Sequence, residues 1–328
     1  MQLENIDKKL LDIIQNQFPL NAEPYVDIAS LLDISEEDVI TRLKKLKDER
    51  VIRRMGAIFD SKQLGYSSSL CAMKVPSHQV DEVAKIINEY SGVTHNYLRD
   101  NEYNMWWTIT ARSQSGIYDI ISEIKDKSGI QSLINLPAVR TFKIEVKFSM
   151  SDEGNLNSAE TAKKQISQTT LTEYEREIVK IIQKDIPLCH SPFKAIASEL
   201  GTEGADLISK LKEMNDHGII RRFCAILRHR SVGISANAMG VWCVPEEKIE
   251  STGAVMTTFS QVSHCYQRVT APDWHYNVYT MIHGKTTYDC EQVARDISQR
   301  TGITDYQLLY SGRELKKSTM IYFTEDDR

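Results

Sequence analysis

The sequence predicts an α+β protein built as a tandem duplication. Each copy is expected to hold a winged-helix-like helix-turn-helix unit followed by a ferredoxin-like βαββαβ sandwich. Three observations predict this: motifs that recur along the chain, apolar residues at helical spacing early in each copy, and alternating strand and helix patterns after them. The length of 328 residues is typical of two or more domains.

The repeat is visible in short motifs that recur at a nearly constant offset. Ile52-Arg53-Arg54 recurs 168 residues later as Ile220-Arg221-Arg222. His95-Asn96-Tyr97-Leu98-Arg99 recurs 169 residues later as His264-Cys265-Tyr266-Gln267-Arg268, and Tyr103-Asn104 and Arg140 recur 173 residues later as Tyr276-Asn277 and Arg313. The offset changes only where loops are expected, which indicates two copies of one module.

Five segments are expected from this repeat. They are a helix-turn-helix unit at 1–52, a ferredoxin-like domain at 53–148, a linker at 149–170, a second helix-turn-helix unit at 171–220 and a second ferredoxin-like domain at 221–328. The linker is rich in Ser, Asn, Gln, Thr and charge, which is typical of a flexible tether. About 20 residues of such a chain span roughly 25 Å, so the copies can pair within one chain, in a homodimer, or both.

Helical spacing defines the start of the first copy. Apolar residues share one face of a first helix, Pro24 opens a second, and Ser35 caps a third with Asp38 in a capping-box-like position. The apolar positions of the first and third helices are Ile6, Leu10, Leu11, Ile13, Ile14, Val39, Leu43 and Leu46. The helix-turn-helix unit is expected to end at Val51-Ile52.

The rest of each copy alternates between strand and helix patterns. In copy 1, strands are predicted at 69–75, 93–99 and 105–111, helices at 80–90 and 116–127, and two closing strands at 130–136 and 142–148. In copy 2, the same order is predicted at 237–243, 249–258, 262–268, 277–282, 288–301 and 307–310. This order is that of a ferredoxin-like sandwich.

Composition narrows the class of protein. The formal net charge of −5 argues against a general nucleic-acid binder, and no apolar run is long enough to span a membrane. The six cysteines lack the spacing of a metal site, so we expect reduced thiols, no metal and a cytoplasmic location.

A helix-turn-helix unit followed by a ferredoxin-like sandwich resembles the Lrp/AsnC class of transcriptional regulators, over nearly the whole of each copy. In that class the third helix must approach DNA phosphates with its first turn. Here that turn is acidic in copy 1, at Ser35-Glu36-Glu37-Asp38, and in copy 2 the corresponding segment 202–206 has Glu203 and Asp206. Carboxylates repel phosphate, so we predict no specific DNA binding.

The candidate site is an alternating trio that occurs in both copies. His95, Tyr97 and Arg99 are spaced by two, so on a strand their side chains share one face; His264, Tyr266 and Arg268 repeat the arrangement. Aromatic residues follow, including Trp274, and two further histidines, His275 and His283, flank the next strand of copy 2. Such a face suits a large planar anion, because aromatic walls stack and arginine binds carboxylates through two donors. Further arginines expected to bind carboxylates are Arg53, Arg54, Arg140, Arg221, Arg222 and Arg313.

These motifs resemble those of the siroheme decarboxylase family, Lrp-like enzymes of siroheme-dependent haem and haem d1 synthesis that usually consist of two homologous subunits. The segments THNYLRDNEYNMWWT (94–108) and SHCYQRVTAPDWHYNVYTMIHG (263–284) carry the resemblance, which covers both copies and indicates a natural fusion. One departure is Val269, which follows Arg268 where a proline is expected.

The resemblance implies decarboxylation of two acetate side chains of siroheme to 12,18-didecarboxysiroheme. No added organic cofactor is implied, since the substrate macrocycle accepts the electrons; haem is a further potential ligand. We expect His264 to donate a proton, assisted by His275 or His283, with Tyr266 in support and Arg268, Arg221 and Arg222 on carboxylates. The matching set in copy 1 is His95, Tyr97 and Arg99.

Alternatives stay open at this stage. A haem- or tetrapyrrole-responsive transcriptional regulator would use the same pocket as a sensor, and a binding module would hold siroheme unchanged. An axial bond to the substrate iron is a competing role for any of the histidines. The sequence leaves open whether both copies are catalytic.

Overall fold

The computed structural model describes residues 3–16, 18–144, 171–227 and 236–324, and the linker expected at 149–170 lies outside them. The chain divides into two compact units. The helical unit comprises Met1–Gly65 and Phe148–Val232, and the barrel unit comprises Tyr66–Lys147 and Gly233–Arg328. Each unit therefore contains parts of both copies.

The helical unit contains two helix-turn-helix motifs, each followed by a strand. In copy 1 the elements are α1 (Asn5–Asn16), α2 (Pro24–Leu32), α3 (Glu36–Asp48) and β1 (Ile52–Phe59); in copy 2 they are α6 (Glu173–Ile182), α7 (Pro192–Glu199), α8 (Gly204–Asp216) and β6 (Ile220–Leu227). Strands β1 and β6 form an antiparallel pair that joins the copies.

The predicted cap and apolar face of α3 are confirmed. The Ser35 hydroxyl accepts a hydrogen bond from the Asp38 backbone N–H at 3.1 Å, and Val39, Leu43 and Leu46 are buried. Strands β1 and β6 were not expected from the sequence. They pack with the helical unit, although the boundaries after residues 52 and 220 assign them to the ferredoxin-like domains; those boundaries stay predictions.

The two copies also exchange contacts within the helical unit. The Met55 backbone N–H donates to Asp185 at 2.8 Å, and the Tyr25 hydroxyl donates to the Pro187 carbonyl at 3.0 Å. The Arg54 guanidinium donates to the Gln183 carbonyl, just beyond the end of α6. The segment between α6 and α7 is therefore held by copy 1.

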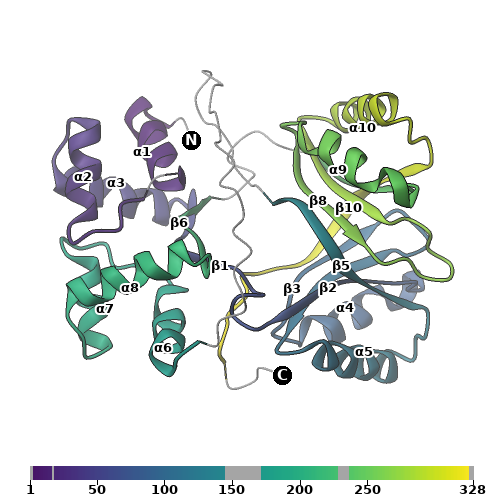
Figure 1. Cartoon of the computed structure of the whole chain (residues 1–328), viewed down its shortest axis with the longest axis horizontal. Coiled ribbons are helices and arrows are strands. Elements are labelled where there is room, and N and C mark those ends of the chain that lie inside the picture. Colours follow the sequence, from purple (N-terminus) through teal and green to yellow (C-terminus); the bar gives the residue numbers. More distant parts are fainter. Residues whose placement is uncertain (1–2, 17, 145–170, 228–235, 325–328) are drawn as a thin grey trace. The chain divides into compact units, whose positions relative to one another are not determined.

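In the described part of the barrel unit, eight strands close in the order β10-β3-β4-β2-β5-β8-β9-β7. Figure 1 shows this unit with the helices α4, α5, α9 and α10 lying on it. Copy 1 contributes β2 (Ser67–Met73), α4 (Val80–Asn88), β3 (Val93–Arg99), β4 (Met105–Ala111), α5 (Gln114–Ser128) and β5 (Leu133–Ile144). Copy 2 contributes β7 (Ala236–Trp242), α9 (Ile249–Thr257), β8 (Val262–Arg268), β9 (Val278–Gly284), α10 (Thr287–Thr301) and β10 (Tyr306–Lys317). Each copy thus has the predicted βαββαβ order.

The last strand of each copy pairs with both copies. The first part of β5 pairs with β2 of its own copy, and its second part pairs with β8 of copy 2. Strand β10 does the reverse, pairing first with β7 and then with β3. The two closing strands predicted at 130–136 and 142–148 are therefore wrong as separate elements, since one strand runs through Pro137; residues 145–148 lie outside the described residues. The copies pair within one chain.

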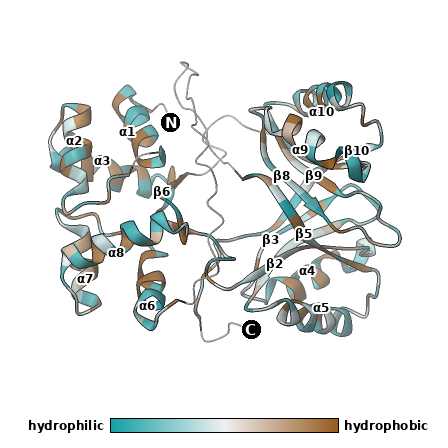
Figure 2. Cartoon of the chain, in the orientation of Figure 1, coloured by the Kyte–Doolittle hydropathy of each residue, from teal (hydrophilic) through white to brown (hydrophobic). Residues whose placement is uncertain are grey.

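The sheet has a helix-covered face and an interior face. On the covered face, α4 and α5 pack on the strands of copy 1, and α9 and α10 pack on those of copy 2. These helices carry hydrophobic and hydrophilic residues along their length (Figure 2), as expected for helices that bury one side. The interior face holds a cluster drawn from both copies: Leu70, Ala72, Tyr103, Trp106, Ile134, Leu136, Met239, Val241, Trp274, Tyr276, Tyr279 and Leu309. None of the described helices has the length and apolar character of a membrane-spanning segment.

Candidate active site

The two His–Tyr–Arg trios lie on β3 and β8 and face the barrel interior. Tyr97 is paired across the sheet with Trp106, and Tyr266 with Tyr279, and both partners belong to the interior cluster. Directly paired residues of antiparallel strands point to the same face. On the opposite face, Asn96 donates to Asn88 of α4 at 3.1 Å. The predicted alternation is therefore confirmed in position.

Each trio is arranged in the same way. The imidazole of His95 stacks against the ring of Tyr97 with centroids 6.3 Å apart, and the Arg99 guanidinium lies 5.6 Å from that ring centroid. In copy 2 the His264–Tyr266 distance is 6.0 Å, and the Arg268 guanidinium lies 4.9 Å from the Tyr266 ring. The histidines and tyrosines are half-buried, so the trios are neither dispersed in solvent nor sealed in a dry core.

Both guanidinium groups are held by backbone carbonyls. Arg99 is 6% exposed and donates from Nη1 to the Leu309 carbonyl at 2.7 Å; Arg268 donates to the Leu136 carbonyl at 2.8 Å. In each arginine the buried Nε has no hydrogen-bond partner among the described residues, where no carboxylate forms an ion pair with either. Burial lowers the pKa of Arg99 to about 10 and also lowers the pKa of Arg268. A buried cation of this kind is stabilised by an anionic ligand.

The copies differ beside the histidines. In copy 1, His95 Nδ1 lies 2.9 Å from the Thr94 hydroxyl, which lies 3.2 Å from the Thr108 hydroxyl. In copy 2, His264 Nδ1 lies 2.8 Å from the Ser263 hydroxyl, which lies 2.7 Å from Nε2 of His283. Copy 2 therefore links two imidazoles through one hydroxyl.

The positions of these two hydroxyl groups beside the histidines were not predicted from the sequence. Thr94 and Ser263 each directly precede the histidine of the trio, and the strands contain a register shift at this point. The signal was available, because a hydroxyl residue precedes the histidine in both copies.

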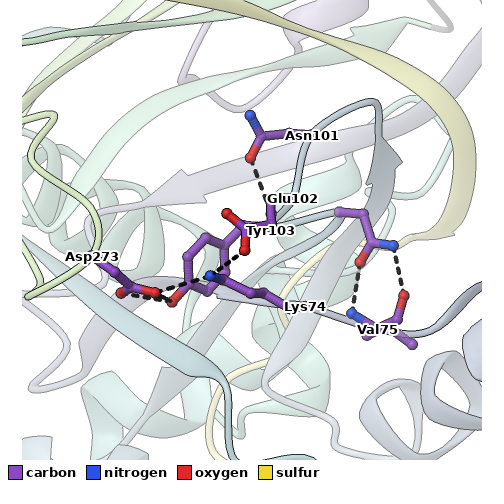
Figure 3. A network of polar contacts seen from close by, with 7 residues as sticks. Lys74, Val75, Asn101, Glu102, Tyr103 and Asp273 are labelled. Atoms are coloured by element: carbon purple, nitrogen blue, oxygen red, sulfur yellow. Dashed lines mark hydrogen bonds and ion pairs between the residues drawn. The ribbon is translucent and has the colours of Figure 1, made fainter.

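Trp274 is a core residue of the interior cluster. It is 5% exposed, its indole donates to the Tyr279 hydroxyl at 2.7 Å, and its ring lies 5.2 Å from that of Trp106 of copy 1. The neighbouring Asp273 accepts from the Tyr103 hydroxyl at 2.9 Å and forms an ion pair with Lys74 at 3.0 Å (Figure 3). Through these contacts the loop before β9 of copy 2 packs against copy 1.

His275 is not brought close to His264. It lies in the loop before β9 and its Nε2 is 3.1 Å from Asp305. The Arg268 backbone N–H donates to the Asn277 carbonyl, whereas His264 is paired with Met281. His275 is therefore at the Arg268 end of β8, and four strand residues separate the two ends by roughly 13 Å.

The other predicted arginines are not gathered at the trios. Arg140 forms an ion pair with Glu250 of α9, and Arg313 forms one with Asp81 of α4 at 2.5 Å, so both lie on the helix-covered side. Arg53, Arg54, Arg221 and Arg222 belong to the helical unit, where Arg221 pairs with Asp60 at 2.9 Å. Their assignment to the substrate stays a prediction.

Comparison with known proteins shows which family models and solved structures this chain resembles. The AsnC-like ligand binding domain model matches residues 63–143 and 231–316, and the siroheme decarboxylase NirDL-like HTH domain model matches 7–53 and 175–221. A siroheme decarboxylase of Hydrogenobacter thermophilus is 37% identical over 97% of this chain and 95% of its own length. The siroheme decarboxylase beta subunit of Methanosarcina barkeri is 51% identical over 43% of this chain and 93% of its own length. A crystal structure of the siroheme decarboxylase NirDL in complex with an iron-uroporphyrin III analogue superposes with a TM-score of 0.78, at 33% identity, covering 98% of this chain and 96% of that one.

Proposed function

Because the chain belongs to the siroheme decarboxylase family, we propose that its barrel unit binds siroheme and removes carbon dioxide from its acetate side chains. The product is 12,18-didecarboxysiroheme, formed by two such reactions. The chain acts as a carboxy-lyase of the fused type, in which each copy corresponds to one subunit of the two-subunit relatives.

The reaction balances with one proton for each acetate. The bond between the methylene carbon and the carboxylate breaks, carbon dioxide leaves, and the bonding electrons stay on the carbon attached to the macrocycle. The conjugated ring delocalises these electrons, and addition of a proton gives a methyl group. The protein must therefore orient carboxylates and deliver protons, and the substrate supplies its own electron sink.

The guanidiniums of Arg99, which is buried, and of Arg268, which is half-buried with an inaccessible Nε, are the observation that carries this proposal. Each lies next to the tyrosine ring of its trio, and its Nε has no partner among the described residues. A polycarboxylated macrocycle compensates such cations, and arginine is suited to this because it offers two parallel donors. That a relative was solved with an iron-uroporphyrin III analogue supports a ligand of this class.

We assign proton delivery chiefly to copy 2. His264 donates the proton to the substrate, and His283 then reprotonates His264 through the Ser263 hydroxyl, which bridges the two imidazoles. Tyr266 holds the imidazole by stacking. In copy 1 the corresponding chain of hydrogen bonds runs from His95 through Thr94 to the Thr108 hydroxyl, which does not titrate near neutral pH. His95 therefore serves a site that reacts more slowly or that only binds the substrate. Coordination of the substrate iron is the competing role for these histidines.

Anaerobic incubation with siroheme, followed by mass spectrometry of the tetrapyrrole, tests the proposal. We expect His264→Ala to reduce turnover by about 100-fold or more, the usual range for loss of a general acid, and His95→Ala to reduce it less. Siroheme binding, followed by its absorbance, separates loss of chemistry from loss of affinity.

Full double decarboxylation by both variants would remove the histidines from the mechanism. Recovery of unchanged siroheme from the wild type would favour the binding module instead. A specific complex in a gel shift at physiological salt would favour the regulator, whereas the acidic first turn of α3 predicts none.

A further inference from the structure

Three side chains of metal-ligand type meet at the end of the barrel unit where β7 ends and β9 and β10 begin. Cys243 follows β7, His275 precedes β9 and Asp305 precedes β10. Their ligand atoms all lie within 4.8 Å of one another, and His275 Nε2 is 3.1 Å from Asp305 Oδ2. Cys243 is half-buried, and the other two are exposed to solvent. The residues come from three loops, so no spacing in the sequence reveals them.

Copy 1 provides an internal comparison at the same place. The Cys243 backbone N–H donates to the Asp305 carbonyl at 3.0 Å, and the Lys74 backbone N–H donates to the Ser132 carbonyl at the same distance. His275 and Glu102 each precede the repeated Tyr-Asn pair. Cys243, His275 and Asp305 therefore occupy the positions of Lys74, Glu102 and Ser132.

The copy 1 position already contains a cation. The Lys74 ammonium lies 2.6 Å from Glu102 and 3.0 Å from Asp273, so two carboxylates surround a covalently attached positive charge (Figure 3). In copy 2 the position of Lys74 holds the Cys243 thiol, that of Glu102 holds His275, and the Asp305 carboxylate stands where copy 1 has Ser132. Copy 2 therefore has no ammonium at this place, and a thiol, an imidazole and a carboxylate face one another there instead.

We propose that Cys243, His275 and Asp305 bind one divalent cation of the zinc type. Thiolate, imidazole and carboxylate are the three ligand classes that Zn²⁺ accepts, and three protein ligands leave a fourth position for water. With bond lengths of about 2.0–2.3 Å, tetrahedral geometry sets ligand atoms roughly 3.3–3.8 Å apart. The His275–Asp305 separation is already close to this range, and rotation of the exposed side chains closes the remainder.

The bound ion would act on the contact between the copies. His275 belongs to the loop whose Asp273 and Trp274 contact copy 1. Through the metal, this loop would be joined to the end of β7 and to the start of β10, which restrains the loop. Zinc would therefore stabilise the paired barrel rather than the reaction centre. This role is independent of siroheme chemistry and is tested without substrate.

Cobalt titration of the chelator-treated, substrate-free full chain is the direct test. We expect one equivalent per chain and the near-ultraviolet absorption of a thiolate–Co²⁺ bond, which Zn²⁺ then displaces. Cys243→Ser should abolish that absorption, and the near-isosteric Asp305→Asn should weaken binding at least tenfold. Zinc should raise the melting temperature of the wild type but not of these variants.

Cys189→Ser is the matched control, because Cys189 is an exposed thiol of the helical unit and should leave the signal unchanged. Cys243→Lys introduces the residue of the corresponding copy 1 position and should eliminate metal binding while keeping the fold, as judged by circular dichroism. Absence of cobalt binding at millimolar concentration, or an unchanged thiolate signal in Cys243→Ser, would overturn the proposal.

Discussion

Arg99 and Arg268 show how single side chains connect fold and function in this protein. Arg99 is buried and Arg268 is half-buried with an inaccessible Nε; each guanidinium is bonded to a backbone carbonyl of the other copy, and no carboxylate of the described residues forms an ion pair with it. Desolvation of such a charge opposes folding, because its interactions with water are only partly replaced. This cost to folding favours the proposed role of both residues in ligand binding.

Replacement of either arginine by methionine should separate these two effects. We expect Arg99→Met and Arg268→Met to weaken siroheme binding at least tenfold, because charge-assisted bonds to carboxylates are lost. The free energy of unfolding should fall by no more than about 1 kcal/mol, or rise, because a buried charge is removed while its chain length is kept. Binding titration and urea unfolding measure the two quantities.

Arg295→Met is the control for this pair, since Arg295 is a surface residue of α10 that pairs with Glu291. Its binding and unfolding should match those of the wild type. Wild-type affinity in both barrel variants would contradict a carboxylate-binding role.

His190 predicts a pH dependence within the helical unit. Its hydrogen bond to Glu36 at 2.7 Å, with Glu23 nearby, raises the pKa of His190 above the ordinary value of 6.5. A raised folded-state pKa contributes stability that is fully present below the unfolded value and is lost as pH rises through the folded value. Stability of the helical unit should therefore decline from about pH 6 upward through that raised pKa.

Urea unfolding followed at several pH values measures this effect. His190→Gln should flatten the decline, whereas His217→Gln, at an exposed position of the same unit, should retain it. An identical pH profile for wild type and His190→Gln would show that the pair contributes nothing.

At the scale of elements, the spacing of residues in the sequence predicts those features of the fold that depend on neighbouring residues alone. The helices, the Ser35 cap and the βαββαβ order follow from spacing of apolar residues, and the alternation on β3 and β8 places each trio on one face. Register shifts in β5 next to Arg140 interrupt the alternation, so the side on which that arginine lies could not be predicted. The pairing of β1 with β6 is a contact between copies, which spacing within one copy does not contain.

The contact between β5 and α9 offers a test of whether the two copies are equivalent in their packing. A Cβ on Gly253 would lie 2.6 Å from the ring of Phe142, whereas the corresponding contact, between α4 and β10, is made by Ala84 and Leu315. We expect Gly253→Ala to destabilise the chain by about 1–2 kcal/mol, since overpacking exceeds the gain of about 1 kcal/mol in helix propensity.

Adding Phe142→Leu to Gly253→Ala recreates the residues of the Ala84–Leu315 pair and should restore stability to within about 1 kcal/mol of the wild type. Phe142→Leu alone should be destabilising because it leaves a cavity. Thermal unfolding of the four proteins forms a double-mutant cycle. Additive effects would mean that the two residues are not coupled.

At the scale of the whole molecule, neither copy completes the barrel without the other. Strands β5 and β10 each extend past their own sheet to pair with the opposite copy, at β8 and β3. A chain cut between the copies would leave half of each long strand without its partner. Such exposed edges favour self-association.

Separate expression of fragments 1–148 and 171–328 should reveal this dependence. We expect each fragment alone to self-associate or to lack cooperative unfolding, and an equimolar mixture to form a one-to-one complex that decarboxylates siroheme. Native mass spectrometry measures the stoichiometry. Fragments that stay folded, monomeric and separate on mixing would show that the long strands are dispensable for each half.

The exchanged carbonyl contacts have an evolutionary consequence. Because Leu309 holds Arg99 and Leu136 holds Arg268, a backbone change in one repeat alters the guanidinium of the other. Changes that move either carbonyl are therefore constrained by the other repeat, whereas the neighbours of the two histidines, Thr108 and His283, belong to their own repeats and differ between them. Encoding both repeats in one polypeptide also makes their supply equal by construction, so no half is synthesised without its counterpart.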